Sequence, residues 1–124
     1  PRPDEAINLD MVGDKQLVIP IERYSLEYHP KLVRHLWDRA KEMGLDAFIG
    51  RVDYAIYDDH IPLNEIAGIP SIDLIDFKYP NSYANFWHTL NDIPENCSEE
   101  SLGQVGDLMV DYIYNREEQN RSEN

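Results

Sequence analysis

The stretch Ala-Ile-Asn-Leu-Asp-Met-Val-Gly occupies residues 6–13 and decides the fold class. Over residues 6–12 apolar and polar side chains alternate with a period of two, which predicts a short β-strand. Asp10 is the carboxylate near the end of this strand, just before the turn at Gly13. Open α/β sheets hold their ligands at the carboxyl ends of strands. Asp10 is therefore either a ligand residue or an ordinary turn or capping residue.

The rest of the chain alternates extended and helical patterns, an order that predicts an α/β domain. Residues 77–94 form a long aromatic loop, and loops of that length are often functional. The expected elements are an extended stretch over residues 16–22, a helix over 29–43, an ambiguous segment over 47–56, a short helix over 61–67, a strand over 69–75 and a helix from 98 to about 115.

The last helix is expected to begin after Ser98, a good N-cap, and to end near Asn115. Residues 116–124 are then a polar, frayed tail. Asp73 and Asp76 flank a buried-looking strand, and we expect them to face outward or to lie at the strand end. The predicted buried stripe of the helix is Leu102, Val105, Leu108, Met109, Tyr112 and Ile113.

Acidic residues outnumber basic ones by 24 to 11, which gives a formal net charge of −13. This charge repels phosphate backbones and anionic membrane surfaces, so we expect neither nucleic acid nor membrane as a partner. Cys97 is the single cysteine, so the chain has no internal disulfide and no cysteine-rich zinc site. A metal site in this sequence would use histidine and carboxylate ligands.

Residues 57–60, Tyr-Asp-Asp-His, form a second cluster of groups that can do chemistry. Adjacent carboxylates with an imidazole suit metal binding, or the orientation of metal ligands. Aspartates in this position equally suit the cap of the short helix that follows.

A third cluster lies in the long loop, where Trp87, His88 and Thr89 precede Asp92. A histidine beside a tryptophan has an apolar wall next to a titratable nitrogen, which suits a metal ligand or a general base. A loop histidine packed against an aromatic ring is the equally good alternative.

Together, these segments resemble the latter half of zinc aminopeptidases and glutaminyl cyclases. The segments occur in the family's order and at compatible spacing, and the resemblance covers roughly residues 5–115. They are Asn-Leu-Asp-Met-Val-Gly at 8–13, Asp-Asp-His-Ile-Pro at 58–62, Gly-Ile-Pro at 68–70, and Trp-His-Thr-Leu-Asn-Asp at 87–92 followed by Glu-Asn at 95–96.

The resemblance implies a partial mixed sheet flanked by helices, the C-terminal half of a zinc-exopeptidase (phosphorylase/hydrolase-like) fold. Residues 1–115 would form the C-terminal part of the catalytic domain, and residues 116–124 the polar tail. The metal would lie at the strand ends.

The same resemblance implies roles for four residues. His88 matches the family's C-terminal zinc ligand. Asp10 matches a carboxylate that binds a second zinc in dinuclear aminopeptidases, or joins a hydrogen-bond network beside the metal in single-zinc cyclases. Asp58 matches the second acid of that network, and Trp87 matches an aromatic wall of the substrate pocket.

The implied zinc site is incomplete, because the family's other ligands lie in segments upstream of Asp10. His29 and His35 do not replace them, since we expect these to lie at the start and on the outer flank of a helix. Asp10 and His88 are two ligands, and a catalytic zinc takes three from the protein. We therefore expect this chain alone to be inactive.

The implied partners are a peptide N-terminus as substrate and either the missing N-terminal half or a second copy, because a half-sheet exposes a strand edge. The alternative is a catalytically dead α/β module that keeps the fold for binding or assembly. Trp87 and the segment 94–96 resemble cyclases more than aminopeptidases, whereas Leu63 stands where animal cyclases have an aromatic residue. Family resemblance points to a secreted or periplasmic location, although no targeting signal is present.

Overall fold

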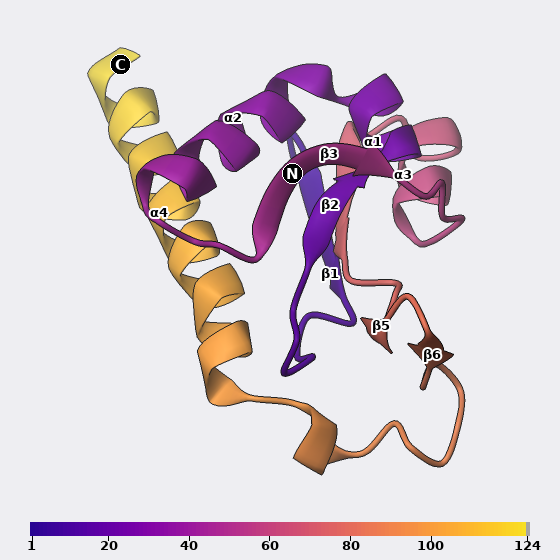
Figure 1. The fold of residues 1–124 in the computed structure, drawn as a ribbon. Helices are drawn as coiled ribbons and strands as arrows, with labels where there is room; N and C mark the ends of the chain where they lie inside the picture. Colours follow the sequence, from indigo (N-terminus) through magenta and orange to yellow (C-terminus); the bar gives the residue numbers. More distant parts are fainter. Residues whose placement is uncertain (124) are drawn as a thin grey trace.

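A computed structural model describes residues 1–123, and its strands form two parallel pairs (Figure 1). β1 (Ala6–Asp10) pairs with β4 (Ser71–Ile75), and β2 (Ile19–Glu22) pairs with β3 (Phe48–Asp53). β2 lies beside β4, and the two pairs run in opposite directions. The predicted α/β class is therefore confirmed, with the strands of the expected mixed sheet arranged as small two-stranded sheets.

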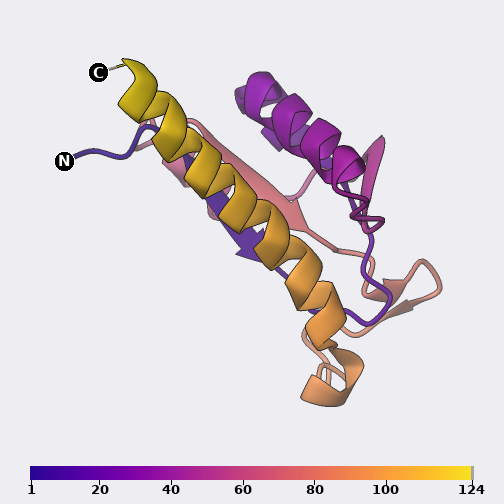
Figure 2. The same ribbon diagram turned by 90° about the vertical axis from the view of Figure 1, so that its left-hand side faces the viewer.

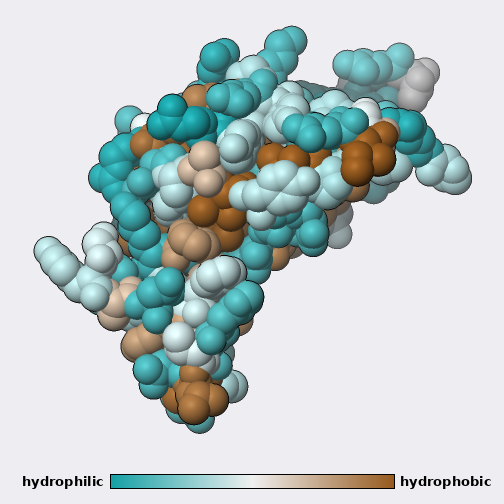
Figure 3. Space-filling view, turned by 90° about the vertical axis from the view of Figure 1, so that its right-hand side faces the viewer, coloured by the Kyte–Doolittle hydropathy of each residue, from teal (hydrophilic) through white to brown (hydrophobic). Residues whose placement is uncertain are grey.

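Helices cover both faces of this layer (Figures 1 and 2). α2 (Pro30–Glu42) and α4 (Glu99–Glu123) pack on one face, with α4 running diagonally across β1 and β4 in Figure 2. α1 (Arg23–Tyr28) and α3 (His60–Glu65) lie together on the other side. In the space-filling view of that side, apolar residues form separate patches among hydrophilic ones (Figure 3).

The β1–β4 pair has an apolar face and a face that carries polar side chains, because side chains alternate along each strand. Ile7, Ile72 and Leu74 point into the core that α2 and α4 close. Asn8 and Asp73 are register partners and hydrogen-bond to each other on the opposite face. The polar face is the one that carries the candidate site.

The helix predicted over residues 29–43 is confirmed as α2. Pro30 occupies its first turn, where the missing N–H costs nothing, and Gly44 follows it with a φ of 71°. Its buried side chains are Leu32, Val33, Leu36, Trp37 and Ala40.

The last helix departs from expectation in length and in its buried stripe. α4 continues to Glu123, so an end near Asn115 is wrong; Asn124 lies outside the described residues. Beyond Asn115 the helix makes no contact with the core and is supported by contacts between its own exposed side chains, such as the Glu117–Arg121 ion pair. Val105 and Leu108 are buried, whereas Leu102 is 50% and Ile113 57% exposed, because only a narrow stripe meets the strands and α2.

The helix α1 and the small elements inside the long loop were not predicted. α1 follows β2 directly and is initiated by Glu22, whose carboxylate accepts the N–H groups of Tyr24 and Ser25. The long loop contains a small hairpin of β5 (Pro80–Asn81) and β6 (Ala84–Asn85), and a 3-10 turn at Pro94–Asn96. Within the described part of the chain, no helix combines the length and apolarity needed to cross a membrane.

The buried stripe of α4 can be tested with two identical substitutions in one helix. Leu108→Ala removes a fully buried side chain, and we expect it to lower the free energy of unfolding by about 2–5 kcal/mol. Leu102→Ala should cost less than about 1 kcal/mol, because Leu102 is half exposed. Urea unfolding of both variants measures the difference; equal losses would mean that α4 packs through a different face.

Candidate functional site

The site begins where β1 ends. Asp10 is half-buried, and the next residue, Met11, has a φ of 53°. A non-glycine residue in the left-handed region is strained, and such residues cluster at functional sites. Among the described non-glycine residues only Met11 and His88 have this backbone, and both belong to predicted site segments.

Asp10 lies against Asp58, as the resemblance implied. Burial, together with the Asp58 carboxyl, raises the pKa of Asp10 to about 6. Burial would also raise the pKa of Asp58, but hydrogen bonds from the Asp59 N–H, Asp73 and Asp10 hold it below its usual range. The two groups therefore titrate as a pair, with the proton on Asp10 and the charge on Asp58.

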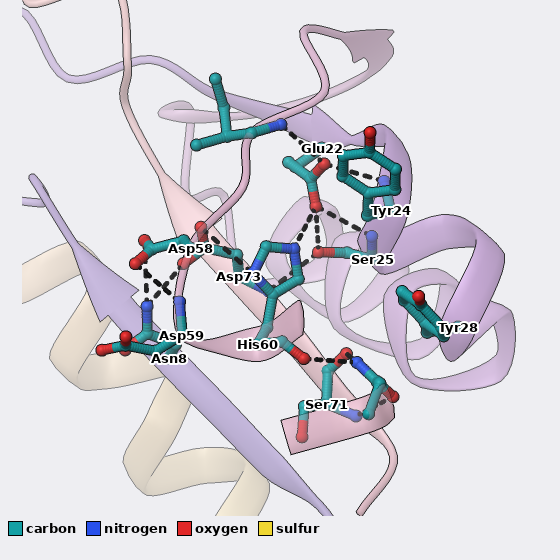
Figure 4. A network of polar contacts seen from close by, with 12 residues as sticks. Asn8, Glu22, Tyr24, Ser25, Tyr28, Asp58, Asp59, His60, Ser71 and Asp73 are labelled. Atoms are coloured by element: carbon teal, nitrogen blue, oxygen red, sulfur yellow. Dashed lines mark hydrogen bonds and ion pairs between the residues drawn. The ribbon is translucent and has the colours of Figure 1, made fainter. Parts of the chain in front are cut away.

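Asn8 joins this pair to the strand layer (Figure 4). Its Nδ2 donates to Asp58 Oδ2 at 3.1 Å and to Asp73 Oδ1 at 3.0 Å. Asp58 Oδ1 accepts the backbone N–H of Asp59 at 2.8 Å, so Asp58 pairs a backbone N–H group at the start of α3. Asp59 occupies the N-cap position but makes no capping bond with its side chain.

The sequence predicts that Asp73 and Asp76 face outward or lie at the strand end. This is wrong for Asp73, whereas Asp76 does lie at the strand end but is buried. Asp73 sits within β4 and Asp76 directly follows it, and both are buried. Burial raises the pKa of Asp73 to about 9, with the nearby Asp58 as a further cause. Burial and a hydrogen bond with Asp14 raise the pKa of Asp76 to about 8.

A signal for these buried acids was present in the sequence. Ile72, Leu74 and Ile75 are apolar on both faces of β4, which is typical of a strand covered on both sides. An aspartate inside such a strand must be buried as well, and must be paired or protonated.

A cavity of about 210 Å³ opens beside Asp10, toward the segment that follows β4. Asp92, four residues after His88, also lines it, so the aromatic loop returns to the end of β1. The complete lining is Asp10, Met11, Gly13, Asp14, Tyr79, Asp92 and Cys97.

His88 and Trp87 lie on the exposed part of this loop. Their rings stack at 3.9 Å, and Trp87 also contacts Phe77. His88 is not among the residues that line the cavity beside Asp10. The loop thus presents an imidazole backed by an indole, which is compatible with a ligand and with a packed loop histidine.

Asp10 and His88 carry the donor atoms that zinc prefers, but the fit to a complete zinc site is only partial. Over residues 1–123, no three or more His, Cys, Asp or Glu side chains are grouped so that they could hold a metal ion. His29 and His35 do not add to the set. His29 is the N-cap of α2 and hydrogen-bonds Glu5 at 2.9 Å, and His35 is exposed against Tyr112.

Comparison with known proteins identifies the family. Residues 4–113 match Peptidase family M28. The chain belongs to this family. No curated protein matches the sequence.

Solved structures of glutaminyl cyclases and zinc exopeptidases match this M28 chain. The Porphyromonas gingivalis glutaminyl cyclase is 34% identical, with a TM-score of 0.83 over 90% of this chain and 42% of its own. The Bacteroides thetaiotaomicron glutaminyl cyclase bound to N-acetylhistamine is 33% identical, with a TM-score of 0.85 over 92% and 39%. A Zn-dependent exopeptidase from Parabacteroides distasonis is 35% identical, with a TM-score of 0.83 over 90% and 39%. The chain spans about two-fifths of the length of these structures.

These matches confirm the predicted family and fold class: the M28 chain is similar to the C-terminal portion of longer zinc-exopeptidase-like proteins. They leave the site residues as predictions. The sequence pointed to no role for Glu22 or Ser25, and it placed His60 in a cluster suited to metal binding without giving it a firm role. All three are fully buried behind Asp58.

The raised pKa of Asp76 predicts how stability depends on pH. Because its folded-state pKa of about 8 lies above the ordinary value of 3.8, the folded protein binds an extra proton between these two pH values. The contribution of protonated Asp76 to the free energy of unfolding is fully present below about pH 4 and is lost as pH rises through 8. Asp76→Asn keeps a neutral donor for Asp14, so the variant should lack this loss and exceed the wild type at pH 8.5 by roughly 1–3 kcal/mol.

Urea unfolding at pH 5 and pH 8.5 measures this effect, with Asp107→Asn on the exposed face of α4 as the control. If the free energy of unfolding differs between pH 5 and pH 8.5 by the same amount in the wild type and in Asp76→Asn, Asp76 is ionised in the folded protein.

Proposed function

We propose that this chain is the C-terminal part of a zinc-dependent M28 enzyme that acts on peptide N-termini. The observation that carries the proposal is the contact between Asp10, at the strained end of β1, and Asp58 in the motif before α3. The similar structures bear the names of glutaminyl cyclases and zinc-dependent exopeptidases, and these names support the same assignment.

Asp10 and His88 would hold zinc together with ligands from a part of the protein outside this chain. Bound zinc polarises a carbonyl group and lowers the pKa of its water. Asp58 would keep Asp10 oriented and exchange a proton with it, because the two carboxyls are coupled through a hydrogen bond. Trp87, stacked on His88, would fix the imidazole and form an apolar wall for the substrate.

The free edge of β1 supports a partner on this side of the molecule. The N–H of Ala6 donates to Pro70 of the segment leading into β4, so the even-numbered residues of this parallel strand direct their backbone groups toward β4. The backbone groups of Ile7 and Leu9 then face the other edge, and Leu9 is 45% exposed. We propose the family's N-terminal portion as the partner there, with a second copy of the chain as the alternative.

Within the family we favour cyclisation of N-terminal glutamine over hydrolysis of the first residue, on the cyclase-like residues around His88. We expect the isolated chain to be inactive. A secreted or periplasmic location belongs to the same proposal and rests on the family resemblance alone.

Zinc titration by calorimetry tests the assignment of the two ligands. The isolated wild-type chain should bind zinc weakly, because it supplies two of the three protein ligands of a catalytic site. His88→Ala and Asp10→Asn should each abolish this binding, and Asp46→Asn, an exposed acid elsewhere, should leave it unchanged.

Two results would contradict the proposal. Zinc binding that survives both ligand substitutions would place the metal on other residues. Tight one-to-one binding by the isolated wild-type chain would mean that it builds a complete site unaided.

A further inference from the structure

Four buried side chains from four elements meet behind Asp58 (Figure 4). Glu22 ends β2 and Ser25 lies in α1, His60 begins α3, and Asp73 sits in β4. All four have no exposed surface. The mechanism proposed above uses none of them, so their polar groups require another explanation.

Glu22 is the ionised member of this cluster. Its Oε2 accepts the N–H groups of Tyr24 at 2.8 Å and Ile56 at 3.1 Å, and its Oε1 accepts from Ser25 and from His60 Nε2 at 2.8 Å. Burial alone would raise the pKa of Glu22, but these hydrogen bonds, that of His60 first, hold it below its usual range. A carboxylate only accepts, so Nε2 of His60 must carry a proton.

This hydrogen bond fixes the other side of the imidazole ring. Nδ1 of His60 points toward Oδ2 of Asp73 at 3.8 Å, and both atoms are buried without a hydrogen-bond partner. In the neutral ring Nδ1 is an acceptor, and a lone pair facing an ionised carboxylate is repulsive. The repulsion between Nδ1 and Oδ2 is removed when the Asp73 carboxyl carries a proton and acts as a donor toward Nδ1.

The other neighbours of Asp73 have the same requirement. Asp73 Oδ1 accepts from Asn8, which also donates to Asp58, so the buried Asp73 carboxyl lies next to the half-buried Asp58 carboxyl. A second carboxyl beside a buried one disfavours the ionised form of the buried group. The neutral form is therefore favoured for Asp73.

We propose that Asp73 is a neutral carboxylic acid whose one proton lies on Oδ2, facing Nδ1 of His60, and that Glu22, acting through His60, keeps it in that state. Glu22, His60 and Asp73 are then positioning residues: they hold Asp58 in place against Asn8 and Asp10. Only the consequence for Asp10 rests on the proposed function. The protonation state of the cluster does not require zinc or activity.

The test uses the full, zinc-free chain and two substitutions at one position. Asp73→Asn supplies neutral N–H donors of the same shape, whereas Asp73→Leu has a similar size and no donor. In ¹⁵N-labelled wild-type protein at pH 7, His60 should be the neutral tautomer protonated on Nε2. The infrared carboxylic-acid band should lose intensity in Asp73→Asn, and Asp76→Asn should remove a separate component of that band.

The asparagine variant should rescue what the leucine variant loses. The backbone N–H of Asp59 reports the position of Asp58, and its NMR signal should stay in Asp73→Asn and move in Asp73→Leu. Doubly protonated His60, or an unchanged acid band in Asp73→Asn, would overturn the proposal, because Asp73 would then be ionised. An equal shift of the Asp59 signal in both variants would show that the donor at position 73 does not hold Asp58 in place. Because no readout involves zinc, failure here is distinct from failure of the zinc titration.

Discussion

The polar face of the β1–β4 pair confines the carboxyl groups of Asp10, Asp58 and Asp73 around Asn8, and these groups cannot all be ionised. Two of the three carry raised pKa values, and the third, Asp58, is held ionised by hydrogen bonds from its neighbours. Asp73 is the fully buried member, so a charge there is the costliest of the three. The arrangement of the rest of the site depends on which of these carboxyl groups are protonated.

This constraint links the fold to the chemistry proposed for it. The apolar face of the same strands is closed by α2 and α4, which bury Ile72 and Leu74 and so fix the opposite direction of Asp73. α3 then brings Asp58 onto the polar face, and the parallel register sets Asn8 opposite Asp73. Asp10 lies two residues after Asn8, at the end of β1. There one of its oxygens could bind a metal while Asp58 exchanges a proton with it. The arrangement gives a carboxylate pair tuned by burial, as general acid–base chemistry near neutral pH requires.

Part of this was readable from the sequence because local patterns determine it. The alternation over residues 6–12 predicted β1, and the proline and glycine around α2 predicted that helix. The link between Asp10 and Asp58 came from the family resemblance and not from a local pattern. The buried acids were missed because an aspartate looks like a surface residue until the strand that holds it is covered on both faces. α1 was missed because its start depends on Glu22, whose ionised state depends on the distant His60. The length of α4 was underestimated because a helix with favourable exposed contacts continues beyond the core it packs on.

The central claim is that Asp10 and His88 are part of a zinc site whose remaining ligands lie in the family's N-terminal portion. The most direct measurement is the zinc content of a hybrid in which this chain replaces the equivalent C-terminal portion, 42% of the length, of the Porphyromonas gingivalis glutaminyl cyclase. The account predicts a folded hybrid that retains zinc through dialysis and loses it when His88 is changed to alanine. A folded hybrid that holds no zinc, or holds it equally well without His88, would contradict the account.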